Sequence, residues 1–532
     1  MTELPAVSMP RRGLGLDHLF AGAIGLLGLG LGARPIADNS FFVHLRTGLD
    51  IAAGQGIPRR DPYSATASGA RWVVQSWLPE LAYGAVHKVA GDGGLLVLMA
   101  VTTATLGLLV ARLARSSSPL RSVGAALLAL GVGSTGWSPR PLLFGLGCLA
   151  LTILVVTAGR RPWLLVPIAW VWVNSHGSFP LGAAWLAAAA FGAGCDVLVV
   201  RRANDRGEAD RAAASHAASD VGAGDVVASD VGAGDVGASD VGAGTNAGIS
   251  GWPAAEVAAL ATRAKALGWF VVGLTVGCVN PLGPRLLLFP LTIGSRHKIF
   301  QAILEWQSPR FQSTDGLVTA AAIVLSVLVL SRRRTPLAVA LPAVCFIGLA
   351  LVAQRNLAPA GIVLAPALGA ALALPARATD NPHRTRLSAR KARIAVALLG
   401  VSATIILAHA ASSPALDLRE YPVHLIDEGE RTGVLAKGRL FAAPDVVGCY
   451  LVLRRGRGAG VFVDDRYDMY PVAVGDDVLA LVHAGDGALG VLDRRHIDVI
   501  LWERGRPLTA LLTAKGWREV LGDRSWTVLQ RP

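Results

Sequence analysis

Residues 94–112 read GLLVLMAVTTATLGLLVAR and carry no charged side chain before the final arginine. A helix needs about 20 apolar residues to cross the hydrocarbon core of a bilayer, so this run is long enough to span a membrane. Similar apolar segments recur along most of the chain. The eleven segments that we expect to span are residues 15–34, 94–112, 122–137, 141–159, 162–174, 179–200, 266–280, 316–331, 335–352, 357–375 and 393–412.

The composition also indicates an α-helical polytopic membrane protein. Of the 532 residues, 52% are hydrophobic and 16% are charged, and the mean hydropathy is +0.49. A soluble globular domain has about 25% charged residues, so the composition excludes an ordinary soluble enzyme. The 61 glycines are typical of membrane helices that pack closely.

The basic residues follow the topology of a membrane protein. The net charge is +13, which in a soluble protein would suggest nucleic acid as a partner. Here the arginines cluster at the ends of apolar segments, so we expect membrane lipids as partners and no nucleic acid. If Arg11 and Arg12 are cytoplasmic and the eleven segments alternate, every short arginine cluster falls on the cytoplasmic side. The sequence therefore predicts a multi-pass protein of the inner (plasma) membrane.

Three regions differ from the apolar segments. Residues 35–93 form a long polar loop after the first segment. Residues 203–250 are a low-complexity insert, rich in Asp, Gly and Ala, which we expect to be cytoplasmic and disordered. From residue 415 onward the composition is that of a soluble domain. The predicted domains are a transmembrane domain, residues 1–414, and an extracytoplasmic soluble domain, residues 415–532.

In this topology, ionisable residues at the ends of the segments collect on the extracytoplasmic side. Several belong to the first loop, which contains amphipathic stretches near residues 41–54 and 76–90. Ionisable groups at membrane depth are costly and indicate function by default, so we expect one polar cavity that opens to the outside. The residues concerned are Asp38, His44, Asp61, Glu80, Arg140, His176, Glu305 and Arg355.

The first loop contains recognisable motifs. Residues 37–83 read ADNSFFVHLRTGLDIAAGQGIPRRDPYSATASGARWVVQSWLPELAY. This pattern resembles the first extracytoplasmic loop of a bacterial family of GT-C-type membrane glycosyltransferases. Later blocks of that family are similar, in the same order, to SPRPLLF, WVNSHGSFPLG, VNPLGPRLLLFPL, EWQSP, QRNLAPAGIVLAP, GRLFAAPDVVGCYLVLRR and VFVDDRYDMYP.

The resemblance implies a GT-C-like fold and inverting transfer of a sugar from a polyprenyl-phosphate carrier to an extracytoplasmic acceptor. The acceptor, whether envelope glycan, lipid or protein, stays open. The resemblance also implies that an acidic residue of the first loop acts as the base or helps to hold a divalent metal, and Asp38 stands at that position. The usual acidic pair is reduced here to Asp38 followed by Asn39, so no cofactor is assigned and a divalent metal stays open.

Inverting glycosyl transfer needs a carboxylate that takes the proton of the acceptor hydroxyl, and cations that stabilise the leaving phosphate. Asp38 is the candidate base. Arg140 and Arg355 are candidates for the phosphate, because a guanidinium binds phosphate oxygens in pairs. His44 and His176 could donate to the phosphate or orient the acceptor.

Structural roles compete with these assignments. Asp38 could cap the amphipathic helix that begins near Phe41. Arg46, also a candidate for donor binding, could rest on the membrane surface. Asp61 could form a turn, and Glu80 could be half of an ion pair. Contacts to the acceptor or within the loops are assigned to Asp61, Glu80, Glu305 and Asp465.

The soluble domain alternates short apolar runs with helical patterns at residues 474–483 and 507–516, which predicts a small α/β domain. The segment VFVDDRYDMY places Asp465 directly after an expected strand, where open α/β sheets bind ligands. A charged docking loop is the alternative for this segment. The expected strands are residues 439–443, 449–452, 461–463, 497–502 and 526–529.

Two other functions remain open. A transporter or flippase for a lipid-linked glycan should have internal repeats and ionisable residues near the bilayer midplane, and neither is visible in the sequence. A non-catalytic scaffold that keeps the GT-C fold is favoured by the missing second acidic residue after Asp38. A lateral groove towards lipid beside Asp38 would favour the enzyme, whereas a filled groove would suit the scaffold.

Overall fold

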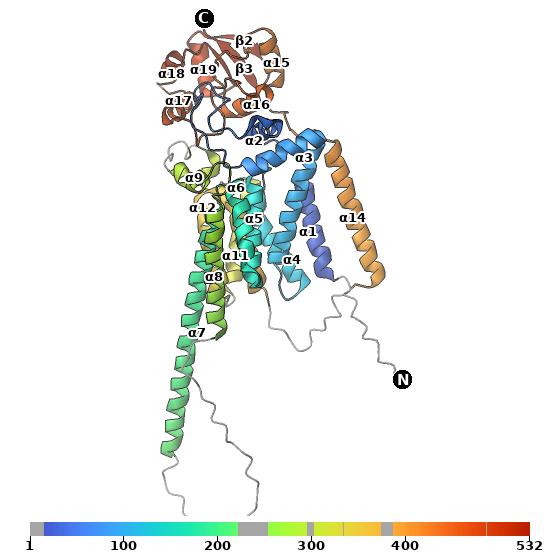
Figure 1. Ribbon diagram of the computed structural model, residues 1–532, viewed down its shortest axis with the longest axis vertical. Helices are drawn as coiled ribbons and strands as arrows, with labels where there is room; N and C mark the ends of the chain where they lie inside the picture. Colours follow the sequence, from blue (N-terminus) through green and yellow to red (C-terminus); the bar gives the residue numbers. More distant parts are fainter. Residues whose placement is uncertain are drawn as a thin grey trace, which may run out of the picture.

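The computed structural model describes residues 15–221, 254–294, 300, 303–332, 335–373, 387–485 and 487–532. Two parts follow one another along the long axis of the molecule (Figure 1). One is a bundle of helices, and the other is a smaller body at one end of the bundle, which contains the C-terminus. We call this body the cap and define it as residues 36–76 and 415–532.

The bundle agrees with the predicted apolar segments, since a helix overlaps each of the eleven. Five of these helices, α3, α7, α8, α11 and α14, are long and apolar enough to cross a membrane, and α1, α5 and α12 are apolar but shorter. The protein is thus compatible with a helical membrane protein, while the number of crossings stays a prediction. The bundle helices are α1 (Leu16–Gly32), α3 (Trp77–Leu113), α4 (Pro119–Gly133), α5 (Leu142–Ala158), α6 (Leu165–Ser175), α7 (Pro180–Val221), α8 (Ala254–Val276), α11 (Thr314–Ser331), α12 (Leu337–Val352), α13 (Leu357–Ala371) and α14 (Ala389–Ser412).

Short helical elements lie between the longer helices. They are η1 (Ile51–Gln55), η2 (Ser134–Gly136), η3 (Pro162–Leu164), α9 (Arg285–Gly294), η4 (Leu304–Trp306) and η5 (Gln354–Asn356). Of these, η2, η4 and η5 lie at the end of the bundle that faces the cap, and their side chains contribute to the cavities described below.

Helices α1 and α3 pack with their backbones in contact. A Cβ atom at Gly28 would lie 2.5 Å from the carbonyl oxygen of Thr103, so only glycine fits there. The Thr103 hydroxyl donates to the carbonyl of Gly28 at 2.7 Å. Helix α3 bends at Gly91, whose φ of 59° interrupts the helical conformation (Figure 1). The predicted amphipathic stretch at residues 76–90 is the part of α3 before this bend.

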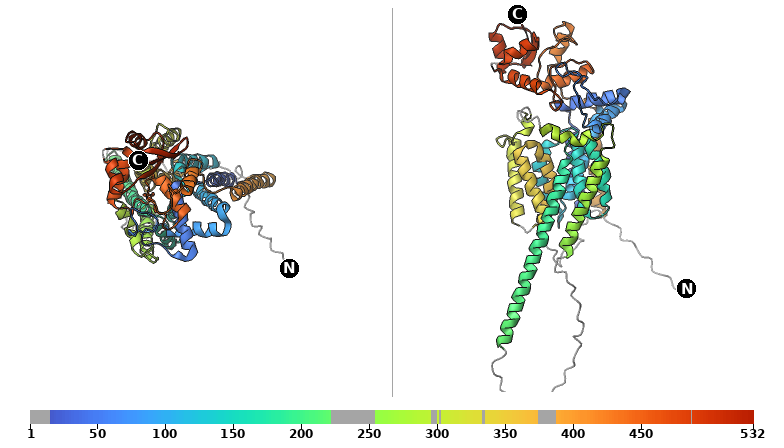
Figure 2. Two further views of the ribbon diagram at one scale, coloured as in Figure 1. Left: turned by 90° about the horizontal axis from the view of Figure 1, so that it is seen from above. Right: turned by 60° about the vertical axis from the view of Figure 1, so that its left-hand side comes forward.

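The first loop forms part of the cap. Helix α2 (Asn39–Asp50) packs against α16 (Asp445–Arg455), and it confirms the amphipathic stretch predicted near residues 41–54. Ser64 pairs with Val461 in a parallel β-bridge. The first loop and the C-terminal region, which are far apart in the sequence, therefore form one body above the bundle (Figure 2).

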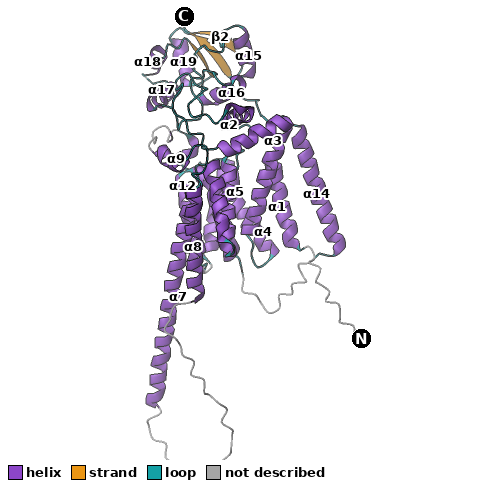
Figure 3. Ribbon diagram, in the orientation of Figure 1, coloured by secondary structure: helices purple, strands orange, loops and turns teal. Residues whose placement is uncertain are grey.

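The C-terminal part of the cap combines helices with a three-stranded sheet (Figure 3). The sheet is antiparallel with the order β1-β3-β2, and Leu501 of β1 is opposite Val528 of β3. The remaining helices and the strands are α15 (Val423–Arg431), α17 (Val472–His483), α18 (Ala488–Arg494), β1 (Val499–Glu503), α19 (Pro507–Ala514), β2 (Arg518–Gly522) and β3 (Trp526–Gln530).

Several expectations for this region were wrong. Residues 449–452 are helical in α16, and residues 439–443 and 461–463 form isolated bridges in place of strands. Short apolar runs do not distinguish a strand from a buried helix, which explains the error. Asp465 follows a single β-bridge, and the sheet of this region is antiparallel. Asp465 therefore does not lie at the end of a strand in an open α/β sheet, where a ligand site was predicted.

The prediction of a disordered insert at residues 203–250 was wrong for its first part. Helix α7 continues to Val221, beyond the apolar segment (Figure 2). Residues 203–221 are rich in alanine and include Arg206, Glu208 and Arg211, and Ala, Arg and Glu favour a helix that is already nucleated by the preceding span. Residues 222–250 lie outside the described residues.

Candidate functional site

A polar cavity of about 290 Å³ lies where the bundle meets the cap. The bundle contributes Arg140, His176, Glu305 and Arg355, all from connections between helices. The cap contributes His44, Asp445, Asp465 and Asp468. Six of the ten residues singled out in the sequence therefore line one cavity: His44, Arg140, His176, Glu305, Arg355 and Asp465.

Arg140 lies between two carboxylates. Its Nε donates to Asp38, and its Nη1 donates to Glu305. Burial by itself would lower the pKa of Arg140, but the charges of Asp38 and Glu305 outweigh it and raise the pKa. The guanidinium therefore stays cationic at the edge of the cavity.

Arg355 is the second cation of the bundle side. It lies in η5, and its guanidinium carbon is 4.1 Å from the centroid of the Trp306 ring, in a cation–π contact. Burial lowers the pKa of Arg355, but an arginine remains charged in proteins even so. Two guanidinium groups in one cavity favour an anionic ligand such as a phosphate.

Asp38 has one of the two roles predicted for it, that of a helix cap. It is the N-cap of α2, which begins at Asn39, and accepts from the backbone N–H of Ser40 at 3.0 Å. Its other oxygen accepts from the Ser138 hydroxyl and from Arg140. The structural role as a helix cap is thus present, and the carboxylate also holds Arg140 in place.

His44 forms a pair with Glu80 across α2 and α3. The Nδ1 atom of His44 is 2.7 Å from Oε1 of Glu80. Burial by itself would lower the pKa of His44, but the hydrogen bond and the charge of Glu80 raise it above its ordinary value. The expected ion pair of Glu80 is therefore present, and its partner is a residue that lines the cavity.

His176 is neutral under ordinary conditions. It follows α6 directly, and its pKa is lowered to about 3 by burial and then by the charge of Arg355. Its Nδ1 accepts from the backbone N–H of Ser178 at 3.1 Å. A neutral imidazole that accepts at Nδ1 carries its proton on Nε2, so His176 can offer one N–H donor and no charge.

Sequence reasoning missed Asp445, whereas Asp468 belongs to the segment VFVDDRYDMY in which a ligand contact was expected. Asp445 is the first residue of α16, and its pKa is raised to about 6 by burial and by the charge of Asp465. Burial also raises the pKa of Asp465. The quoted motifs APDVVGCY and VDDRYDMY contain these aspartates, but no local pattern marks them as neighbours of the first loop.

Arg46 is not part of the cavity, contrary to its assignment as a donor-binding residue. Its guanidinium bonds Asp50, one turn further along α2, and lies near Gly456. Residues two apart on a helix point about 200° apart, so His44 and Arg46 face opposite sides of α2. The spacing therefore allows only one of the two to reach the cavity.

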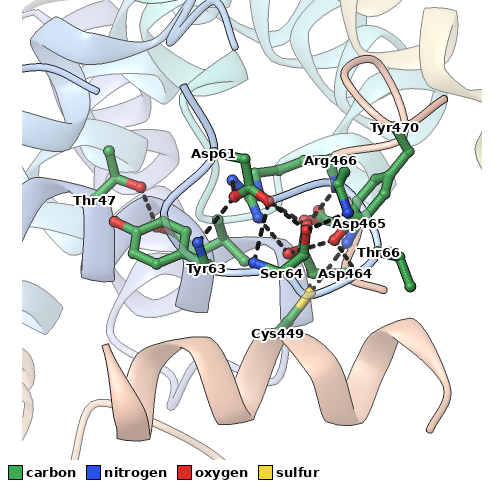
Figure 4. A network of polar contacts seen from close by, with 12 residues as sticks. Thr47, Asp61, Tyr63, Ser64, Thr66, Cys449, Asp464, Asp465, Arg466 and Tyr470 are labelled. Carbon is green, nitrogen blue, oxygen red and sulfur yellow. Dashed lines mark hydrogen bonds and ion pairs between the residues drawn. The ribbon is translucent and has the colours of Figure 1, made fainter. Parts of the chain in front are cut away.

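Asp61 has the structural role that was expected as its alternative, since it forms a turn and makes contacts within the loops, and it is not among the residues that line the cavity. Its carboxylate accepts from the backbone N–H of Tyr63 at 3.0 Å and lies 2.9 Å from Arg466 (Figure 4). Arg466 also bonds Asp464 at 2.6 Å. This buried network connects the first loop to the segment that carries Asp465 (Figure 4).

An apolar groove of about 800 Å³ runs along the outside of the bundle between α1, α4 and α14. Its walls are mainly leucine, isoleucine, alanine and glycine, and Arg34, Ser134 and Trp137 also line it. Trp137 is followed by Ser138, whose hydroxyl donates to Asp38. The contacts of Ser138 with Asp38 and of Asp38 with Arg140 therefore link the residue next to the groove to a residue that lines the polar cavity.

The donor set of the first loop does not fit a metal. The oxygens of Asp38 are engaged by Ser40, Ser138 and Arg140, and Asn39 replaces the second carboxylate. In the described part of the chain, no group of three or more His, Cys, Asp or Glu residues is arranged to hold a metal ion.

No protein-family model matches the chain, and no curated protein matches it. The resemblance to GT-C-type proteins therefore rests on the quoted motifs alone.

Proposed function

We propose that this protein is a membrane glycosyltransferase that moves a sugar from a polyprenyl-phosphate carrier to an extracytoplasmic acceptor. One observation carries the proposal. Trp137 lines an apolar groove of the bundle, and the contacts of the next residue, Ser138, with Asp38 and of Asp38 with Arg140 connect this groove to a polar cavity with two arginines. A lipid-linked sugar has an apolar tail, an anionic phosphate and a polar sugar, and this junction offers a complementary surface to each.

The orientation is inferred from the arginines at the end of the bundle away from the cap. Arg112 and Arg115 follow the apolar part of α3, and Arg160 and Arg161 follow α5. By the positive-inside rule this end is cytoplasmic, which leaves the cap and the cavity outside the inner membrane. Eleven crossings and a GT-C-like architecture belong to the same proposal.

The donor would lie with its tail in the groove. Burial of apolar chain contributes about 0.8 kcal/mol for each CH₂ group, so a long groove holds a polyprenyl chain without specific contacts. Arg34 would meet the phosphate at the mouth of the groove, and Arg140 and Arg355 would bind it in the cavity. The N–H of neutral His176 would donate to the sugar or to the phosphate.

In the transfer step the acceptor oxygen bonds to the anomeric carbon while the bond from that carbon to the phosphate oxygen breaks. The electrons of that bond leave with the polyprenyl phosphate, and a carboxylate takes the hydroxyl proton. Both carboxylate oxygens of Asp38 already accept hydrogen bonds, one from Ser40 and the other from Ser138 and Arg140. We therefore assign proton transfer to Asp445, whose pKa of about 6 suits a base near neutral pH, and we assign to Asp38 the positioning of Arg140.

The open groove favours this function over the two alternatives. A scaffold that had lost the chemistry would have no reason to keep an apolar groove of about 800 Å³ next to Ser138, which bonds Asp38. A transporter would place its ionisable groups near the middle of broken helices, whereas the cavity lies between the bundle and the cap.

The test is a transfer assay with the purified full-length protein in lipid. A panel of polyprenyl-phosphate sugars is supplied with candidate acceptors, and release of polyprenyl phosphate is followed. We expect release with at least one donor and a fall of at least about a hundredfold in Asp445→Asn. Folded wild-type protein that releases nothing from any donor would support the scaffold instead.

A further inference from the structure

The polar cavity continues into an inner branch of about 110 Å³ beneath the start of α3. The branch shares Ser40, His44, Gln75, Asp465 and Asp468 with the main cavity. Its remaining lining includes Glu80 and the apolar side chains of Val43, Val73 and Val74. The branch thus combines apolar side chains with the carboxylates of Glu80, Asp465 and Asp468 and with the guanidinium of Arg466.

Two buried oxygen atoms on residues that line this branch or the main cavity have no partner among the described residues. They are Oε2 of Glu80 and the hydroxyl of Ser76, which lines the main cavity. Glu80 is 2% exposed and Ser76 is fully buried, so solvent at the protein surface does not reach them. Polar atoms that lack a partner are destabilising when buried, and they are rare unless water or a ligand completes them.

The charges around the branch select a neutral hydrogen-bond donor. Glu80, Asp465 and Asp468 would repel a phosphate, although phosphate suits the arginines on the bundle side of the main cavity. His44 and Arg466 already pair with Glu80 and Asp464, so a further cation is not needed for charge balance. Hydroxyl groups satisfy carboxylate oxygens without adding charge.

Size limits what can enter. A water molecule occupies about 30 Å³ in the liquid, so the branch holds only about three or four waters or one edge of a sugar ring. The rest of the ring would stay in the main cavity, next to Asp445. Waters in the branch can be displaced without loss when a ligand hydroxyl reproduces their hydrogen bonds.

We propose that the inner branch is a subsite for hydroxyl groups of a saccharide acceptor, with Oε2 of Glu80 as the principal acceptor of their hydrogen bonds. This subsite rests on the proposed function, and it names the acceptor class as a sugar in place of a protein side chain or a simple lipid. Glu80 binds the hydroxyls and His44 holds Glu80 in position through its 2.7 Å contact.

The test measures binding of methyl glycosides to the full-length protein in nanodiscs without any donor. Titration calorimetry or saturation-transfer NMR is run with methyl hexosides and pentosides, and with analogues that each lack one hydroxyl. The variants are Glu80→Gln, which is close in shape, and Ser76→Ala. The matched control is Glu420→Gln, the same change at an exposed position of the cap.

We expect Glu80→Gln to weaken binding of the preferred glycoside by about tenfold to a hundredfold, as expected for a hydrogen bond to a charged group. One deoxy analogue should bind the wild type less tightly than the parent glycoside by a similar factor. The same analogue and the parent glycoside should bind Glu80→Gln with equal affinity. Ser76→Ala should weaken binding by about threefold to tenfold, because it removes one hydrogen bond between neutral groups. This variant provides the test if Glu80→Gln does not fold.

Equal affinities of the wild type and Glu80→Gln for every glycoside would overturn the subsite, and so would the absence of binding to folded wild-type protein. These results differ from failure of the proposed function. Transfer without an effect of Glu80→Gln on binding would remove only the subsite. Glycoside binding without transfer from any donor would keep the subsite and remove the transferase.

Discussion

Arg466 lies 2.9 Å from the carboxylate of Asp61, and this ion pair joins the C-terminal part of the cap to the first loop. The guanidinium carbon of Arg466 is also 4.5 Å from the centroid of the Trp72 ring. Because Asp465 lies between Asp464 and Arg466 in the chain, these contacts hold the backbone from which Asp465 reaches the cavity.

Replacing Arg466 by methionine should destabilise the cap by about 3 to 5 kcal/mol, because it leaves the buried carboxylates of Asp61 and Asp464 without their cation. Hydrogen exchange of the cap amides and denaturant unfolding would measure the loss. Arg419→Met is the matched control, since Arg419 also pairs with an aspartate two positions earlier, Asp417, but is exposed. An exposed pair contributes little, so equal effects of the two substitutions would contradict the role of the network.

Asp38→Asn and Asp445→Asn should reduce transfer in different ways. Asp445→Asn should lower kcat by about a hundredfold and abolish the rise of the rate as the pH passes about 6. Asp38→Asn should mainly raise KM for the donor, because Arg140 loses a partner, and should keep that pH dependence. If kcat collapses in Asp38→Asn while Asp445→Asn stays active, Asp38 is the base.

The raised pKa of Asp445 also predicts how stability changes with pH. The pKa is about 6 in the folded protein, mainly through burial, against about 4 for an exposed aspartate. Between these values the folded state binds more protons than the unfolded state, so the free energy of unfolding falls as the pH rises from about 4 to about 6. Asp445→Asn should remove this fall and be more stable at pH 7 by on the order of 1 to 3 kcal/mol. Denaturant unfolding of the wild type and of Asp445→Asn at several pH values checks this prediction. The same pH dependence of the free energy of unfolding in both proteins would contradict the raised pKa of Asp445.

Filling the apolar groove should impair donor binding without unfolding the protein. Leu27 lines the groove and is 58% exposed, so Leu27→Trp is expected to fold. It should raise KM for the lipid-linked donor by at least about tenfold, or 1.4 kcal/mol, by occupying the space of the tail. Leu398→Trp on α14 is the control, because Leu398 is similarly exposed and is not among the residues that line the groove. Loss of activity in both variants would indicate a general effect on the bundle.

The helices of the bundle were predictable because a run such as residues 94–112 is apolar throughout, and hydrophobicity is a property of each residue alone. It was also predictable that Arg140, His176 and Arg355 lie together, because each of them lies at the end of an apolar segment on the same side of the bundle. Helix α16 was not, because VVGCYLVL suits a buried helix and a buried strand equally.

The partners of these residues were decided by the tertiary structure. Asp38 pairs with Arg140, and Glu80 pairs with His44, only because α2 folds back onto the start of α3 and towards the loop before α5. Asp445 and Asp465 reach the same cavity only because the C-terminal region docks on the first loop.

By itself, the sequence determined that helices form, which of their ends carry arginine, and which polar residues gather at the opposite end, since hydropathy and charge act locally. Only the tertiary structure decided that Asp38 holds an arginine, that Arg46 and Asp61 do not line the cavity, and that one carboxylate oxygen of Glu80 has no partner within the described ranges of the chain. Those outcomes depend on distances between residues far apart in the chain, and a single sequence carries no record of such distances.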